Sequence, residues 1–288
     1  MVYTYTSHIW SEEEIIKFYD TVLVDLKPNE TDFFCIAARK KYMTQEEREA
    51  TRMGDTCMMN KTVVKEHNSR KFLAKVHQAD SSMDWYTSLN GAILPRSCMV
   101  IYININHTSV PKAVRDFKHE LAEYDYEFSC ASVKENENNA SRKLAGIHNR
   151  ILKSFQDPKN QNSEWVDIDL DVDKTKVSVK DIYEIIRDLE SHEVSSLFGV
   201  VPIVETQGGY HILISKQATK TMNKFVARVY EYREIQDHVM TPGRVLQRLK
   251  NVLDESAVKE ITINQNNMVP LPGTLQNGFE VKLHLENI

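Results

Sequence analysis

Three aspartates alternate with apolar residues in the segment WVDIDLDVDK, at Asp167, Asp169 and Asp171. Strict alternation is the period of a β-strand with one buried face and one polar face, so the three carboxylates are predicted to share one side of a sheet. Like charges at this spacing repel one another unless cations neutralise them. Hard oxygen ligands suit Mg²⁺, Mn²⁺ or Ca²⁺. The segment therefore predicts a divalent-metal site on a strand.

The acidic segment allows two other interpretations. A solvated loop is the commoner structure for an acidic run, but the regular apolar residues between the aspartates argue against it. A calcium loop of the EF-hand type needs Gly at its sixth position and Glu at its twelfth. Counted from Asp167, those positions hold Val172 and Ser178, which excludes the EF-hand.

A second polar constellation lies in the segment ETQGGYHILI. Gly208 and Gly209 allow backbone N–H groups to approach an anion, Thr206 and Gln207 add donors, and His211 follows on the next strand. Taken alone, a Gly-Gly pair is more often only a hairpin turn, and a single strand histidine is more often structural. Beside the aspartates, the combination predicts a site for a nucleoside triphosphate and its metal ion.

The elements that position these residues indicate a mixed α/β chain. Residues 1–160 contain two helix starts with capping-box pairs, Ser11 with Glu14 and Thr44 with Glu47. They also contain a β-rich run at 98–105 and a helix at 110–125 that opens with Pro111. The polar stretch 157–164 is the predicted module boundary.

Beyond that boundary the predicted order is strand, helix, two strands, two helical segments and a strand. Their ranges are 165–171, 178–192, 197–205, 209–215, 220–236, 243–255 and 260–264. This β-α-β-β-α-β order predicts an α+β fold with a ferredoxin-like or RNA-recognition-like sheet in a module at 161–288, packed on an N-terminal α/β module at 1–160. The first and third strands are neighbours in that topology, so the aspartates should face the strand that carries His211.

Composition limits the function classes. The chain has 288 residues, 41% hydrophobic and 27% charged, which is ordinary for a globular protein. Neither a membrane span nor a signal peptide is predicted, and the four cysteines form no CxxC pair, so we expect a cytoplasmic protein without zinc or membrane partners. Residues 1–160 carry equal acidic and basic charge, so the net charge of −5 lies in the second module. Nucleic acid would therefore be bound through local basic patches and metal ions.

Three motifs in residues 160–288 resemble those of the archaeo-eukaryotic primase superfamily, the primase-polymerases, in its plasmid and viral form. Asp167 and Asp169 match the acid-x-acid pair of the first motif, and TQGGYH, with His211, is similar to the second. The segment VPLPGTLQNGFEV resembles a Pro-Gly-Thr segment near the end of the catalytic core. For a virus-encoded member, the compartment implied is the host cytoplasm.

The resemblance implies a nucleotidyltransferase, a DNA or RNA primase or primase-polymerase that uses NTPs or dNTPs on a single-stranded DNA template. It implies two Mg²⁺ or Mn²⁺ ions. The small stand-alone core, in which we find no helicase domain, suggests a separate helicase as partner. Asp167, Asp169 and His211 are the implied catalytic residues, and Asp167, Asp169 and Asn264 the implied metal ligands. The implied nucleotide-binding residues are Thr206, Gln207, Gly208, Gly209, His211 and Lys216.

Two departures from the family pattern leave a second interpretation open. Asn264 stands where the third motif normally has a carboxylate, with Glu260 on the same face earlier in the strand. The zinc knuckle of several relatives is also missing. The alternative is a catalytically weakened protein of the same fold that binds nucleotide or single-stranded nucleic acid in replication or regulation. A metal-dependent nuclease would use the carboxylates but has no need of the Gly-Gly-x-His segment.

Overall fold

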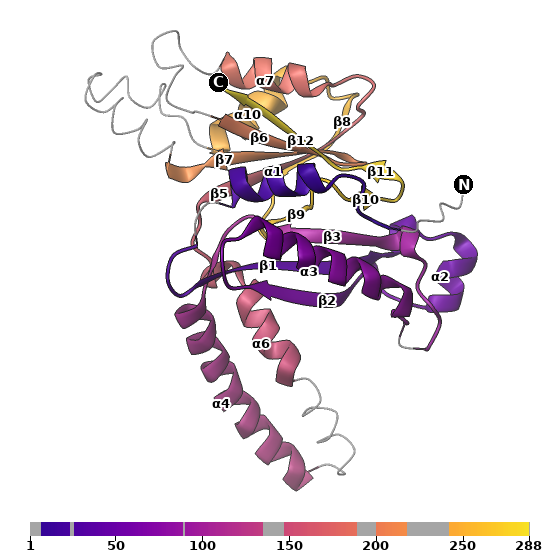
Figure 1. The fold of residues 1–288 in the computed structure, drawn as a ribbon, viewed down its shortest axis with the longest axis vertical. Helices are drawn as coiled ribbons and strands as arrows, with labels where there is room; N and C mark the ends of the chain where they lie inside the picture. Colours follow the sequence, from indigo (N-terminus) through magenta and orange to yellow (C-terminus); the bar gives the residue numbers. More distant parts are fainter. Residues whose placement is uncertain are drawn as a thin grey trace.

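The computed structural model describes residues 7–23, 26–88, 90–134, 147–188, 200–217 and 242–287. The chain is a mixed α+β protein with antiparallel sheets, as the sequence predicts. Figure 1 shows one sheet in the lower half of the molecule and another in the upper half. The predicted helix at 220–236 lies outside the described residues. Within the described ranges, no helix is both long enough and apolar enough to cross a membrane.

The lower sheet has the strand order β2-β1-β3-β9, and every neighbouring pair is antiparallel. Its strands are β2 (Thr56–Val64), β1 (Glu30–Arg39), β3 (Met99–Asn104) and β9 (Met268–Pro270), with β4 (Thr108–Ser109) paired to the start of β1. Because β9 comes from the last part of the chain, both halves of the sequence build this sheet.

Three helices of the first half begin directly after a capping residue. They are α1 (Glu12–Val22), α2 (Gln45–Thr51) and α3 (Ser69–Ser82). Two of these caps, Ser11 and Thr44, were predicted from the sequence, and the third is Asn68. The Ser11 side chain accepts a hydrogen bond from the backbone N–H of Glu14 at 3.2 Å, and Thr44 forms the complete capping box with Glu47. The buried faces of α1 and α3 pack on the β1 side chains Phe34 and Ile36.

Two further helices, α4 (Val110–Lys134) and α6 (Ile147–Gln156), extend away from the body as a pair (Figure 1). The base of the pair is fixed to β4, because the Thr108 hydroxyl donates to the Phe155 carbonyl at 2.8 Å. This anchorage brings Gln156, the last residue of α6, against the lower sheet. Short 3₁₀ turns occur at Lys40–Tyr42, Met83–Trp85, Arg96–Cys98 and Pro158–Asn160.

The upper sheet has the order β12-β6-β7-β5-β8, again with antiparallel neighbours. Its strands are β12 (Lys282–Asn287), β6 (Val200–Glu205), β7 (Gly209–Ser215), β5 (Trp165–Val172) and β8 (Val258–Ile263). Helices α7 (Val179–Arg187) and α10 (Pro242–Val252) cover one face, and the hairpin of β10 (Leu275–Gln276) and β11 (Phe279–Glu280) precedes β12.

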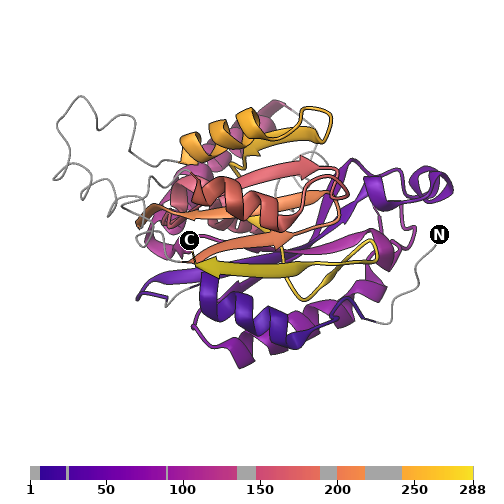
Figure 2. The same cartoon turned by 90° about the horizontal axis from the view of Figure 1, so that it is seen from above.

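Alternation along β5 decides what each face of the upper sheet carries. Ile168, Leu170 and Val172 are buried against α7 and α10, which leaves the aspartates on the opposite face. The predicted neighbourhood of the two polar strands is confirmed, because Asp169 pairs directly with His211. Farther along this face the sheet packs on α1, as the Figure 2 view of β12 beside α1 shows.

Candidate functional site

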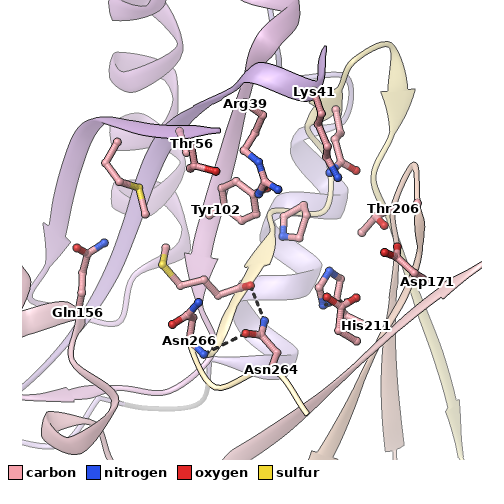
Figure 3. A pocket seen from close by; sticks show the side chains of 17 residues that line it. Arg39, Lys41, Thr56, Tyr102, Gln156, Asp171, Thr206, His211, Asn264 and Asn266 are labelled. Carbon is pink, nitrogen blue, oxygen red and sulfur yellow. Dashed lines mark hydrogen bonds and ion pairs between the residues drawn. The ribbon is translucent and has the colours of Figure 1, made fainter. Parts of the chain in front are cut away.

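A cavity of about 620 Å³ lies between the two sheets (Figure 3). This volume is within the range of small-molecule sites in proteins. The lower sheet contributes alternate residues of paired strands, since Ala37 is opposite Met58 and Arg39 is opposite Thr56. The upper sheet contributes Asp169, Asp171 and His211, and its β6–β7 turn contributes Thr206 and Gly208. The cavity therefore brings the two predicted polar segments, which lie in the second half of the chain, against strands from the first half of the chain.

The three aspartates of β5 have different environments. The Asp167 side chain is 0% exposed, and its carboxylate lies 3.0 Å from His211 Nδ1 and accepts a hydrogen bond from Asn264 Nδ2 at 2.8 Å. The Asp169 side chain is 41% exposed and lines the cavity together with Asp171. Asp167 is thus engaged by protein donors, whereas Asp169 and Asp171 present carboxylate oxygens to the cavity.

His211 is held in its charged form by the aspartates. Burial alone would lower the pKa of the imidazole, but Asp167, Asp169 and Asp171 outweigh burial and raise that pKa to about 9. At neutral pH the imidazolium therefore donates through Nδ1 to Asp167. His211 also lines the cavity, and its Nε2 has no hydrogen-bond partner among the described residues.

The two open carboxylates suit a hard cation. Burial raises the pKa of Asp169, and the negative charges of Asp167, Asp171 and Glu260 add to the effect against the opposing influence of His211. A cation between Asp169 and Asp171 would relieve this repulsion. In the part of the chain that the structure describes, no group of three His, Cys, Asp or Glu side chains gathers as a metal site. Mg²⁺ commonly takes one or two protein carboxylates and completes its shell with water and substrate phosphates.

The Gly-Gly turn is shaped by packing against β5. A Cβ on Gly209 would lie 1.9 Å from the Leu170 carbonyl oxygen, and one on Gly208 would lie 2.8 Å from Asp171 Oδ1. The Thr206 N–H donates to the Gly209 carbonyl and the Gln207 N–H donates to Gln276 Oε1, both at 2.9 Å. These bonds take two of the N–H groups predicted to hold a phosphate. Among the described residues, the Gly208 N–H has no hydrogen-bond partner and remains for a ligand.

The other predicted nucleotide-binding residues differ in position. Thr206 lines the cavity, although its hydroxyl also donates to the Gly209 carbonyl at 3.2 Å. Gln207 is exposed and does not line the cavity. Lys216 donates to the Ser163 hydroxyl and is likewise not part of the cavity lining.

Asn264 lies directly after β8 and reaches the aspartates, but as a hydrogen-bond partner. Its amide nitrogen donates to Asp167 and to the Met268 carbonyl, at 2.8 and 3.1 Å. Its amide oxygen accepts from the Asn266 N–H at 3.0 Å. The oxygen that was predicted to coordinate a metal is therefore used to shape the turn between β8 and β9.

We expect Asn264→Asp to destabilise the protein at about pH 7 by about 1–3 kcal/mol, because it places a second carboxylate on buried Asp167 and removes a donor. The loss should shrink toward about pH 5, since two adjacent carboxylates can share one proton and the pKa of the pair is raised. Thermal unfolding at both pH values measures this. Asn266→Asp, whose side chain is exposed, is the matched control. An Asn264→Asp protein as stable as this control would contradict the assigned hydrogen bond.

Sequence reasoning missed the basic side of the cavity. Arg39, at the end of β1, and Lys41, in the following turn, line it opposite the aspartates (Figure 3). Arg39 Nη1 donates to the Tyr102 hydroxyl at 2.6 Å, whereas its buried Nε has no hydrogen-bond partner in the described structure. Burial and Arg39 lower the pKa of Lys41, while Asp171 and Asp169 raise it. The Arg-Lys-Lys run that ends the β1 segment was the available signal.

Comparison with known proteins identifies no relative of this chain. No protein-family model, no curated protein and no solved structure matches the chain. The assignment of a function therefore depends on the geometry and charge of the cavity.

Proposed function

We propose that the cavity binds a nucleoside triphosphate with its divalent cation, and that the protein is a primase or primase-polymerase that transfers nucleotidyl groups on a single-stranded template. The observation that carries the proposal is one cavity in which Asp169 and Asp171 face Arg39 and Lys41, with charged His211 beside them. Carboxylates for a metal and cations for phosphates are both needed by a metal-bound triphosphate.

The upper sheet supports the same proposal. Its strand order β6-β7-β5-β8, with α7 and α10 on one face, fits the ferredoxin-like order proposed for the catalytic module. The fold alone would carry no function, because one fold hosts many activities. Its relevance is that the two central strands place Asp169 opposite His211.

Each side chain has a distinct proposed role. Asp169 and Asp171 would hold the divalent cation, which would lower the pKa of an attacking hydroxyl and neutralise charge on the phosphates. His211 and Arg39 donate to the triphosphate. Asp167 is a positioning residue, because it orients His211 and Asn264 from beneath the cavity. In this assignment the metal pair is displaced by one pleat from the pair that the family resemblance implies.

The direct test is synthesis on an unprimed template. The protein is incubated with labelled ATP or dNTPs, Mn²⁺ and single-stranded DNA, and the products are separated by length. Short labelled oligomers that depend on both metal and template support the proposal. Shortening of the template without synthesis identifies a nuclease instead and overturns it.

The second candidate is a non-catalytic protein that binds nucleotide or single-stranded nucleic acid. The observation that favours it is Asn264, whose amide is spent on Asp167, so that the third-motif position offers no carboxylate to the cavity. This candidate would be selected if calorimetry shows tight nucleotide binding while the synthesis assay yields no oligomer product.

Arg39→Met should weaken triphosphate binding by about 10- to 150-fold, the effect of losing a hydrogen bond to a charged group. The long apolar Met side chain keeps much of the packing, so Mn²⁺ binding without nucleotide should barely change. Calorimetry with Mn²⁺ alone and then with nucleotide separates the two effects. Arg70→Met, at an exposed position of α3, is the matched control. Unchanged nucleotide affinity in Arg39→Met would remove Arg39 from the phosphate site.

A further inference from the structure

The cavity has two chemically different ends. Figure 3 places Asp171, Thr206 and His211 on one side and Gln156 on the opposite side. The first side is charged and holds the proposed metal and phosphate groups. The second lies at the root of the α4–α6 pair, where α6 ends. A ligand that fills the cavity must therefore be charged at one end and neutral at the other.

The cavity lining also contains apolar side chains. It includes Ala37, Met58 and Met268, and β9 brings Pro270 beside the Tyr102 ring through the Tyr102–Pro270 pair. Apolar side chains with one aromatic ring suit a flat, weakly hydrated group better than a phosphate.

Two side-chain amides of the cavity lining have no hydrogen-bond partner among the described residues. They belong to Gln156, which is half-buried, and Asn266, which is exposed. The other two amides of the cavity are used within the protein, because Gln276 accepts from Gln207 and Asn264 donates to Asp167. The amides of Gln156 and Asn266 are therefore open to hydrogen bonds from a ligand that enters the cavity.

We propose that the neutral end binds the nucleobase of the nucleotide and that Gln156 sets which base is preferred. This inference rests on the proposed nucleotide-binding function and deepens it. An amide offers one donor and one acceptor side by side, and Gln or Asn pairs in this two-point manner with adenine N6 and N7. The protein should therefore bind an adenine nucleotide most tightly even when no template is present.

The test is the equilibrium affinity of the full chain for ATP, GTP, CTP and UTP with Mn²⁺ and no template. In the wild type, ATP should bind about 5- to 100-fold more tightly than the weakest of the four. Gln156→Leu should reduce that spread to less than about twofold. Gln156→Glu, which keeps the shape but offers only acceptors, should move the preference toward CTP, because a carboxylate accepts from cytosine N4. Gln247→Leu, on the exposed face of α10, is the matched control.

The possible outcomes separate this inference from the function on which it rests. Equal affinities in the wild type, or a preference that both Gln156 variants leave unchanged, overturn the role of Gln156 while nucleotide binding stands. Failure of all four nucleotides to bind overturns the proposed function and the base site with it. If Gln156→Leu does not fold, a shift toward CTP in Gln156→Glu still supports the proposal, and its absence overturns it.

Discussion

Asp169→Asn should reduce nucleotide incorporation by about 100- to 1,000-fold while leaving the protein folded. The substitution removes one of the two carboxylates open to the cavity, and metal-ion catalysis supplies several kcal/mol of charge stabilisation. Folding should be unaffected or improved, because Asp169 lies among the like charges of Asp167, Asp171 and Glu260. The measurements are the rate of oligomer synthesis and the Mn²⁺ affinity, with thermal unfolding as the check on the fold.

Asp173→Asn is the matched control for this variant. Asp173 continues the same acidic segment, but its carboxylate accepts from Thr175 in the turn after β5 and does not line the cavity. Incorporation by Asp173→Asn should remain close to that of the wild type. Full activity in Asp169→Asn would exclude this carboxylate from the mechanism.

Asp167→Ala should instead destabilise the fold, by about 3–5 kcal/mol. Asp167 is completely buried, and its removal leaves charged His211 and the amide of Asn264 without their partner. Removing one member of a buried, hydrogen-bonded charge pair typically costs this much. Urea unfolding, followed by circular dichroism, measures the change in the free energy of unfolding.

Asp167→Asn provides the control for size and hydrogen bonding. It keeps an acceptor oxygen for one of the two donors, so its loss of stability should be smaller than that of Asp167→Ala. An Asp167→Ala protein as stable as the wild type would show that Asp167 is not the buried anchor. Substitution of Asp167 is expected to reduce stability, and substitution of Asp169 is expected to reduce incorporation. These different effects distinguish two residues that have the same local sequence pattern.

Local patterns in the sequence predicted the strands that carry the aspartates and His211. Alternation placed the aspartates of β5 on one face and its apolar residues on the other, because strand side chains have a period of two. Capping residues located the starts of α1 and α2, because a cap satisfies N–H groups within one turn. The order of the elements also predicted that β5 and β7 are neighbours, which brings His211 to the aspartates.

Only the tertiary structure distinguishes the environments of the three aspartates. Asp167, Asp169 and Asp171 have the same local pattern, but Asn264, 97 residues away from Asp167, fills one place on its carboxylate and His211 fills another. Likewise, the basic side of the cavity comes from the end of β1 and the amide of Gln156 comes from the end of α6. Local sequence spacing does not predict that these segments lie near the aspartates. Burial, hydrogen-bond partners and the facing charge are properties of contacts between distant segments. These contacts separate the positioning carboxylate from the two that face the cavity.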